Sequence, residues 1–484
     1  MNRWNRRLAL VAMAAMLLMN AMPANAAQQV RLNPKAPQTL MIWHYYNGIQ
    51  QQVFDRLVLE FNESIGTDAG VIVEAHSQGS ISDLTTKLLN AANNEPGADE
   101  MPDLFGAYAD TAYQLDQMGY VADLAPYMEA DELSAYVDSY IREGELGQSG
   151  TLKVFPIAKS TELLLLNETD WQPFAQATGA DKSKLSTWEG LVELAKAYYT
   201  WSDAQTPEIS GDGKAFFGRD AFANYILLGS LQLGVEMFAV RNGELYLNVD
   251  ETVMRTLWDN YYVPMVNGWF GAYGRFRSDD IKTGRLIALV GSTSGALYFP
   301  SEVTRDDGTT YPIVSEVYPL PNFDGTKPYA VQQGAGLVVT KSTPEKEYAA
   351  TLFLKWFTEA QNNIEFSIHS GYLPVRKTAN DQAMLDTAIE RNGMSPLLKK
   401  IIDVGVQITS TYQLYTNSAF RHGYEARNVV ESSMSTAATE AVAERDRLIA
   451  QGVTREAAIA QLTGDEAFSA WLGEFREALA TAVQ

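Results

Sequence analysis

The sequence reads LMIWHYYNGIQQQVFDRLVLEFNESIGTDAGVIVEA at residues 40–75. Leu40 to Trp43 is an apolar run of the length of a buried strand, and Val71 to Ala75 is a second one. Between them, apolar residues recur every three or four positions, a spacing that predicts one face of a helix. These residues are Val53, Phe54, Leu57, Val58, Phe61 and Ile65. The stretch therefore predicts a strand, a helix and a second strand.

The same alternation continues beyond this stretch. A second helical stripe runs from Ile81 to Leu89, and Asp103 to Gly106 reads as a third strand. A strand–helix–strand–helix–strand series predicts an α/β fold with a parallel sheet and right-handed connections. In such sheets, ligands bind outside the carboxyl ends of the strands, beside the N-termini of helices.

The rest of the chain adds more helices and two further strands. Residues 180–285 read as mostly helical, and the two strands are expected at Leu286 to Val290 and at Leu337 to Val339. Two helical segments close the chain, at about 424–448 and 455–480. With 484 residues, the chain is long enough for two or three lobes, because single cores rarely exceed about 250–300 residues.

Charge and cysteine content exclude several classes of protein. The chain carries 37 Lys and Arg against 59 Asp and Glu, a formal net charge of −22, so its surface repels a phosphate backbone and nucleic acid is not an expected partner. It has no cysteine, which excludes disulfides, cysteine-ligated metal sites and thiol catalysis. Its four histidines include no pair at i and i+4 spacing, and we expect neither a metal nor a cofactor.

The N-terminus has the plan of a secretory signal peptide. Arg3, Arg6 and Arg7 precede an uncharged apolar run from Leu8 to Met19, and Ala24-Asn25-Ala26 has the small-x-small pattern of a cleavage site. A membrane anchor is the alternative, but a spanning helix needs about 20 apolar residues. We therefore expect residues 1–26 to be a cleaved signal and the mature protein to lie in the periplasm. Without a cysteine at the cleavage site, no lipid anchor is expected.

Five motifs, taken in order, carry a resemblance to a known family. They are Met101–Leu104 with Met118–Leu124, Pro156–Thr161, Thr283–Gly295, Gly334–Val339 and Gly371–Arg376. This order and spacing resembles the family 1 extracellular solute-binding proteins of ABC importers, over most of residues 38–430. Within the family, the chain looks most similar to the glycerol-3-phosphate- and sugar-binding branch.

The resemblance implies a two-lobe periplasmic-binding-protein fold of class II, each lobe a mostly parallel sheet flanked by helices. Lobe 1 would hold residues 27–157 with 292–333, and lobe 2 would hold 158–291 with 334–484. A hinge would join the lobes, and the solute would bind in the crevice between them. The chain would cross the hinge near Ile157, Gly291 and Gly334.

Aromatic residues at the ends of predicted strands are the first candidate ligand contacts. Trp43, His44 and Tyr45 end the first strand, and Tyr108 follows the third. Aromatic faces stack on the C–H face of a sugar ring, and the His44 imidazole hydrogen-bonds hydroxyls. The alternative is that Trp43 belongs to the core. The related branch has an acidic residue directly after the tyrosine, whereas this chain has Ala109 and then Asp110.

Small residues at the expected crossings form the second group. Ser160 and Thr161 offer hydroxyls, Ser294 and Gly295 lie in a loop suited to a backbone nest, and Gly334 allows close approach of a ligand. The alternatives are a turn or helix cap for the hydroxyls and a plain hinge role for the glycine.

Three further residues complete the candidates. The resemblance places Tyr372 in the crevice and Arg427 opposite a phosphate, where a guanidinium suits an anion. A salt bridge on the helix surface is the alternative for Arg427. Trp269, in a glycine-rich segment, is a candidate to line the crevice, as aromatic residues often do for saccharides, and packing is its alternative.

The sequence thus predicts the periplasmic substrate-binding component of an ABC transporter. It would capture a sugar, oligosaccharide or polyol and deliver it to the permease subunits, with glycerol-3-phosphate or a glycerophosphodiester as the alternative ligand. We expect a monomer. A secreted carbohydrate-active enzyme would need two carboxylates across a cleft, and no motif marks such a pair.

Overall fold

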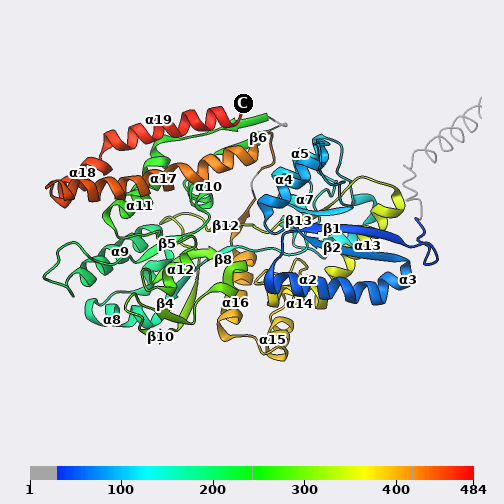
Figure 1. Ribbon diagram of the computed structural model, residues 1–484, viewed down its shortest axis with the longest axis horizontal. Helices are drawn as coiled ribbons and strands as arrows, with labels where there is room; N and C mark the ends of the chain where they lie inside the picture. Colours follow the sequence, from blue (N-terminus) through cyan, green and yellow to red (C-terminus); the bar gives the residue numbers. More distant parts are fainter. Residues whose placement is uncertain (1–29, 242–243, 417) are drawn as a thin grey trace, which may run out of the picture.

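Two four-stranded sheets organise the molecule, each at the centre of one lobe (Figure 1). The computed structural model describes residues 30–241, 244–416 and 418–484. The expected signal peptide, residues 1–26, lies outside the described residues.

The first sheet has the strand order β13-β3-β1-β2. As the alternation of strands and helices predicts, β1 pairs in parallel with β2 and with β3, whereas β13 is antiparallel to β3. These strands are β1 (Gln38–His44), β2 (Val71–Ser77), β3 (Leu104–Ala107) and β13 (Gly336–Val339). The main helices of this lobe are α2 (Gly48–Phe61), α4 (Ile81–Ala92), α5 (Ala109–Gln117), α7 (Asp138–Gly144), α13 (Pro344–Phe357) and α14 (Ala360–Ser370). Shorter ones are α3 (Thr67–Ala69) and α6 (Ala130–Ser134).

The apolar stripe predicted for residues 53–65 is confirmed over the length of α2. Its members from Val53 to Phe61 are buried against the sheet. Ile65 differs, since it is exposed. The reason is a kink at Ser64, where φ is −120° and ψ is −106°, so the helical repeat breaks after α2 and Ile65 leaves the stripe.

The second sheet has the order β11-β4-β8-β5 and is mixed. β4 is antiparallel to both β8 and β11, and only β5 and β8 are parallel, so this sheet is not mostly parallel. The strands are β4 (Glu162–Asn167), β5 (Phe217–Arg219), β8 (Ala288–Ser292) and β11 (Ser315–Pro319). The helices of this lobe are α8 (Glu168–Thr178), α9 (Trp188–Asp203), α10 (Phe222–Gln232), α11 (Glu251–Asn267), α12 (Arg277–Lys282) and α16 (Pro396–Thr411). A hairpin of β6 (Phe238–Arg241) and β7 (Glu244–Leu247) lies outside the sheet.

The strand pairing corrects the expected division of the chain. β11 joins the second sheet and β13 joins the first, the reverse of placing 292–333 in lobe 1 and 334–484 wholly in lobe 2. After β8 the chain does not cross the hinge at Gly291. It makes a 3-10 turn at Thr293–Tyr298 and returns to the free edge of β4 through the short strands β9 (Glu302–Thr304) and β10 (Thr310–Pro312).

Two segments pass side by side between the lobes. Phe155 pairs with Leu337 and Ser160 pairs with Gln333, so the segments run antiparallel. Gly334 has a φ of +96°, and a Cβ there would lie 2.7 Å from the carbonyl oxygen of Ala158, so only glycine fits this close crossing.

A third connection completes the hinge. It runs through α15 (Gln382–Arg391) and α16, and the nearby β12 (Tyr329–Val331) and β14 (Gln413–Tyr415) pair in parallel. We infer that lobe 1 comprises residues 30–157 and 334–377, and that lobe 2 comprises 161–331 and 396–484.

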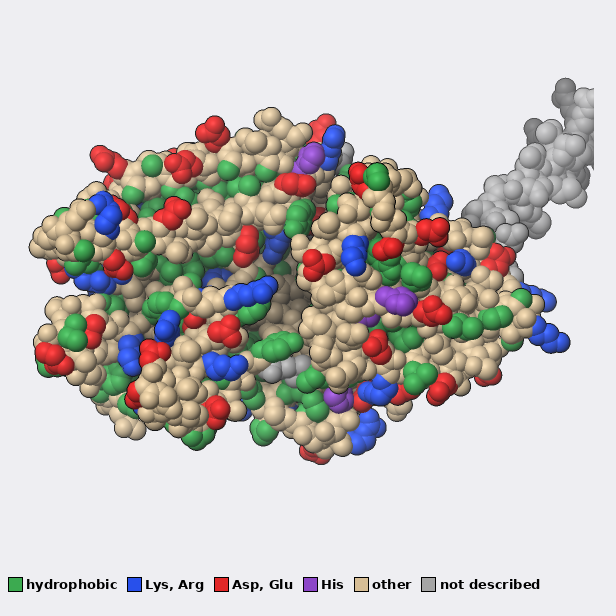
Figure 2. Space-filling model, viewed as in Figure 1, with side chains coloured by type: hydrophobic (Ala, Val, Ile, Leu, Met, Phe, Trp, Pro, Cys, Tyr) green, Lys and Arg blue, Asp and Glu red, His purple; other side chains and the backbone are tan. Residues whose placement is uncertain are grey.

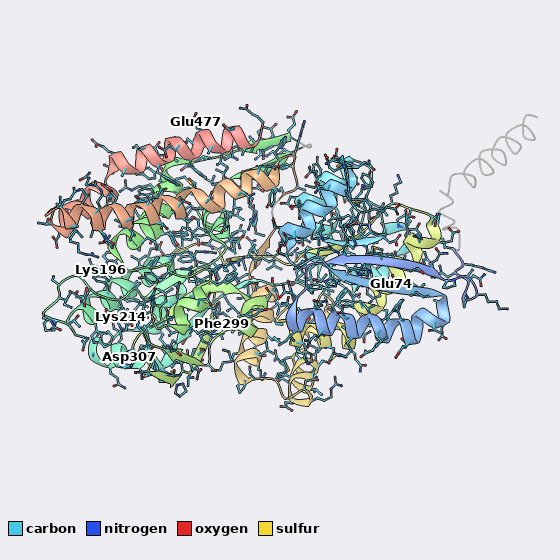
Figure 3. All side chains as sticks on the ribbon, viewed as in Figure 1. Glu74, Lys196, Lys214, Phe299, Asp307 and Glu477 are labelled. Atoms are coloured by element: carbon cyan, nitrogen blue, oxygen red, sulfur yellow. The ribbon has the colours of Figure 1, made fainter. Side chains whose placement is uncertain are left out.

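The C-terminal helices pack on lobe 2. They are α17 (Gly423–Ala450), α18 (Arg455–Thr463) and α19 (Asp465–Ala482), so the expected segment at 455–480 is two helices that part at Gly464. Trp471 of α19 lies against Trp258 of α11, with ring centroids 5.1 Å apart. Glu477, on the opposite face of α19, projects from the edge of the molecule (Figure 3). Across the described ranges, no helix combines the length and apolarity that crossing a bilayer requires.

Candidate functional site

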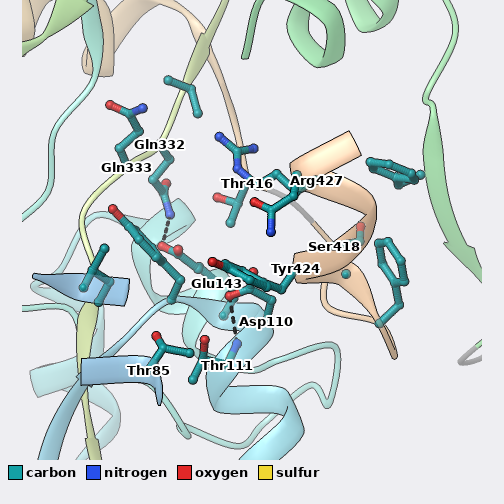
Figure 4. A pocket seen from close by; sticks show the side chains of 18 of the residues that line it. Thr85, Asp110, Thr111, Glu143, Gln332, Gln333, Thr416, Ser418, Tyr424 and Arg427 are labelled. Atoms are coloured by element: carbon teal, nitrogen blue, oxygen red, sulfur yellow. Dashed lines mark hydrogen bonds between the residues drawn. The ribbon is translucent and has the colours of Figure 1, made fainter. Parts of the chain in front are cut away.

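A cavity of about 290 Å³ lies between the two lobes, and Figure 4 shows it from close by. Its lobe 1 wall lies at the carboxyl end of β3 and the start of α5, where parallel sheets bind ligands. That wall and the crossing segment contribute Ile81, Ser82, Thr85, Tyr108, Ala109, Asp110, Thr111, Glu143, Val331, Gln332 and Gln333. Lobe 2 contributes Ala221, Phe238, Thr416, Ser418, Phe420, Gly423, Tyr424, Arg427 and Asn428.

The carboxylate of Glu143 joins the cavity to the hinge. Its Oε2 accepts a hydrogen bond from Nε2 of Gln332 at 2.5 Å and another from Nζ of Lys159 (Figure 4 shows the former). Lys159 is 1% exposed and also donates to the carbonyl oxygen of Gly334 at 2.8 Å. Oε1 of Gln332 and Oε1 of Gln333 are buried and accept no hydrogen bond from any described residue, which leaves two acceptors at the cavity wall.

Arg427 enters the cavity from α17 and is anchored by a neutral amide. Its Nη2 donates to Oδ1 of Asn224 at 2.7 Å, and Nδ2 of Asn224 donates to Glu162 at 2.8 Å. Glu162 is fully buried and receives Nη2 of Arg219 at 3.0 Å. Burial raises the pKa of Glu162, and the Arg219 charge opposes that rise. Because Asn224 carries no charge, the positive charge of Arg427 is not neutralised by its anchor.

Asp110 and Tyr108 face the same cavity from lobe 1. Burial raises the pKa of the Asp110 carboxyl, and the positive charge of Arg427 opposes that rise. Burial also raises the pKa of the Tyr108 phenol, which therefore stays a neutral donor and acceptor. The cavity thus brings together two carboxylates, a guanidinium, three amides and two tyrosines.

Of the residues singled out from sequence, Tyr108 and Arg427 line this cavity. Gly334 directly follows Gln333 and serves the crossing of the two hinge segments. Tyr45 and Tyr372 form a separate pair, with their hydroxyl oxygens 3.1 Å apart. Ser294 lies in the turn after β8, whose backbone passes close to Gly371, the residue before Tyr372.

The other singled-out residues do not line the cavity. Trp43 is 4% exposed and packs with Leu84 and Leu88, so it belongs to the core, the alternative given for it from the sequence. Ser160 and Thr161 are buried where the hinge segments pair, Trp269 packs on the lobe 2 core, and Gly295 lies in the turn after β8.

His44 is likewise buried rather than in contact with the cavity. It is 1% exposed, and its Nδ1 accepts a hydrogen bond from the backbone N–H of Tyr46 at 3.2 Å. Burial, with added repulsion from His76, lowers the pKa of His44 from 6.5 to about 4.

Sequence reasoning missed most of the polar residues of the cavity. Asp110 follows β3 and is detectable from the rule that ligands meet the carboxyl ends of strands. Gln332 and Gln333 directly precede the hinge glycine. Glu143 and Tyr424 carry no comparable local signal, because their positions depend on how helices far apart in sequence pack.

A second cavity, of about 590 Å³, adjoins the first and is lined from both lobes. The two share Ala109, Glu143, Thr416 and Ser418, and the second continues along α7 to Arg142. The space between the lobes is therefore larger than the first cavity alone.

Comparison with known proteins places this two-lobe architecture in a family. The sequence matches the bacterial extracellular solute-binding proteins over residues 57–392. The chain belongs to this family. The matched span includes the lobe 1 wall and the crossing segments of this solute-binding protein, and it ends before Arg427 and α17. No match was found among curated proteins.

Solved structures share the fold over nearly the whole length. UgpB from Mycobacterium tuberculosis, solved with glycerophosphocholine, is 17% identical with a TM-score of 0.65, covering 93% of this chain and 100% of its own. The cyclic α-maltosyl-1,6-maltose-binding protein of Arthrobacter globiformis is 18% identical with a TM-score of 0.64, covering 93% and 99%. The GacH receptor of Streptomyces glaucescens, solved with acarbose, is 14% identical with a TM-score of 0.61, covering 92% and 99%. These likenesses show the two-lobe fold.

Proposed function

We propose that this protein is the substrate-binding component of an ABC importer and captures a sugar, oligosaccharide or polyol between its lobes. The observation that carries the proposal is the interlobe cavity, where Asp110 and Tyr108 of lobe 1 face Arg427 and Tyr424 of lobe 2. Ligand contacts from both lobes stabilise the closed form more than the open one. The ligand therefore has a higher affinity for the closed form, and this difference in affinity drives hinge closure.

The polar groups of the cavity suit hydroxyls. Each sugar hydroxyl both donates and accepts, so the several hydroxyls of a sugar together suit the acceptors on Asp110, Gln332 and Gln333 and the donors of Arg427. The rings of Tyr108 and Tyr424 supply apolar faces for the C–H side of a sugar ring. Two solved structures of the same fold, the cyclic α-maltosyl-1,6-maltose-binding protein and the GacH receptor with acarbose, support a saccharide as the class of ligand.

Arg427 favours a second candidate ligand, a glycerol phosphate or glycerophosphodiester. A guanidinium with a neutral anchor is suited to a phosphate, and UgpB was solved with glycerophosphocholine. Asp110 opposes this alternative, because its carboxylate would repel a phosphate in the same cavity. The neutral ligand is therefore the primary proposal.

The remaining parts of the proposal follow from the family and the N-terminus. The protein would be a monomer secreted to the periplasm by a cleaved signal, and it would pass its solute to membrane permease subunits. It would bind the solute without converting it, because the matched family consists of binding proteins.

A thermal-shift screen tests the ligand class. Purified protein is heated with neutral mono- to hexasaccharides, polyols, glycerol-3-phosphate and glycerophosphocholine. We expect a neutral saccharide to raise the Tm of the wild type. Asp110→Ala together with Tyr108→Ala should remove that rise. Met118→Ala, which changes an exposed residue just after α5, should keep it. A rise caused only by the phosphate esters would establish the alternative. No shift with any of these solutes would refute both, and slow cleavage of a bound saccharide would refute a purely binding role.

A further inference from the structure

A cavity of about 330 Å³ lies in lobe 2 beside the interlobe cavity. The two cavities share Ala221, and α17 forms one wall of both. Arg427, Glu431, Ser435 and Thr439 follow one another at four-residue spacing along α17, so they share one face of that helix. Figure 2 shows the surface hollowed between α17 and the region of β5 and α12. We refer to this 330 Å³ cavity as the α17 cavity.

The backbone at the junction is unusual. Ala221 has a φ of +48°, in the left-handed region that residues with a Cβ rarely adopt. Left-handed residues other than glycine persist only where the surrounding structure holds them, and they gather at functional sites. Here Glu431 supplies that support, because its carboxylate accepts the backbone N–H groups of Phe222 at 2.8 Å and Ala223 at 2.7 Å.

Most charged groups of the α17 cavity are already paired. Glu431 caps α10, and Asp220 accepts the backbone N–H of Arg277 and lies 3.5 Å from its Nε. The Arg219 guanidinium is committed to Glu162. Arg275 differs, since it forms no salt bridge with any carboxylate of the described residues. The cavity therefore keeps one unpaired guanidinium.

An exposed aromatic ring lies beside that guanidinium. Phe276 is 51% exposed, and the guanidinium carbon of Arg275 lies 5.3 Å from its ring centroid. The hydroxyls of Ser435 and Thr439 face the same cavity and, although each donates to its own helix, each still accepts a hydrogen bond. An aromatic face, a free guanidinium and hydroxyl acceptors together match a sugar ring.

We infer that the α17 cavity is a second subsite, which binds the distal rings of an extended neutral saccharide whose first ring lies in the interlobe cavity. This inference rests on the proposed function and narrows it to oligosaccharides. Phe276 would stack on a distal ring and Arg275 would donate to its hydroxyls. The long α17, which lies beyond the family's matched span, would supply the wall that makes the subsite.

Calorimetric titration with matched short and long saccharides tests this subsite. Wild-type protein is titrated with the di- and hexasaccharides of gluco-, manno-, xylo- and galacto-series. We expect the tightest-binding hexasaccharide to bind more tightly than the disaccharide of the same series. Phe276→Ala together with Arg275→Ala should lower the affinity for the hexasaccharide alone, by about threefold to tenfold. Tyr246→Ala is the matched control, because Tyr246 of β7 is 47% exposed, also carries an arginine over its ring and lines neither cavity.

The outcomes separate this inference from the proposed function. Equal affinity for the two lengths in the wild type, or an unchanged length preference in the Phe276 and Arg275 variants, would overturn the subsite while leaving saccharide binding intact. An equal loss for both lengths would also overturn it, because the variants would then act on the interlobe cavity. Failure of every saccharide to bind would refute the proposed function itself.

Discussion

At the residue scale, the anchoring of Arg427 explains how one cationic group is aimed into the cavity. Asn224 fixes one guanidinium nitrogen, and Asn224 is itself held by the buried pair of Glu162 and Arg219. An intact buried ion pair adds little net stability, whereas removing one partner is strongly destabilising. The pair of Glu162 and Arg219 is therefore a rigid support rather than a source of affinity. The free donors of Arg427 are left for the solute.

Removing Arg427 should therefore weaken binding without unfolding the protein. A hydrogen bond to a charged group contributes about 1.5–3 kcal/mol, so Arg427→Ala should lower saccharide affinity by about 10- to 150-fold. Asn224→Ala should lower it less, because the guanidinium stays present but loses its orientation. Titration calorimetry measures both, and Arg447→Ala, an exposed residue of the same helix, is the control. Unchanged affinity in Arg427→Ala would exclude a ligand contact.

His44 predicts a defined acid sensitivity. With a pKa of about 4 when folded and about 6.5 when unfolded, the unfolded chain binds a proton between these values that the folded chain does not. The stability due to neutral His44 is therefore full above pH 6.5 and is lost as the pH falls to 4, by up to about 3 kcal/mol.

Urea unfolding at a series of pH values checks this dependence. We expect His44→Gln to be less stable than wild type at pH 7 and to lose less stability on acidification to pH 4. His422→Gln, which removes a histidine outside the core, is the control. An identical pH slope in wild type and His44→Gln would show that His44 titrates normally in the folded protein.

Individual site residues were predictable where a strand end or the family resemblance indicated them. Tyr108 follows β3 and the resemblance indicated Arg427, and both line the cavity. Trp43 and His44 are the last two residues of β1, but their side chains turn into the core, which residue type and position alone do not reveal. Glu143 reaches the cavity only because α7 packs beside the hinge.

At the element scale, the βαβαβ series of lobe 1 was predictable because its strands are neighbours in sequence and joined by single helices. The pairings of β11 with β4 and β13 with β3 were not, since their partners lie more than 100 residues away in the chain. Local periodicity shows that a strand exists but not which sheet edge it joins.

The C-terminal helices make a prediction at this scale. Trp471 is 5% exposed, stacks 5.3 Å from Phe475 and donates its Nε1–H to Ser433 of α17, so α19 holds α17 in place. Trp471→Ala should destabilise the protein by about 3–5 kcal/mol. Urea unfolding measures the loss, and Leu59→Ala, an exposed residue of α2, should change stability by less than about 0.5 kcal/mol. A small loss in Trp471→Ala would mean that α19 is not part of the lobe 2 core.

At the scale of the whole molecule, the hinge and the cavity share groups. Glu143 lines the cavity and at the same time binds Lys159 and Gln332, which lie on the two crossing segments. A solute that contacts Glu143 therefore touches the elements that reorient when the lobes move. Opening and closing are a two-state equilibrium that a ligand shifts by its difference in affinity for the two states.

The central claim is that a solute binds between the lobes, and a crystal structure of the complex tests it most directly. The protein is crystallised with the saccharide that gives the largest rise in Tm. The account predicts a sugar ring enclosed between Tyr108 and Asp110 of lobe 1 and Tyr424 and Arg427 of lobe 2. Saccharide density on one lobe alone, or outside the interlobe cavity, would contradict it.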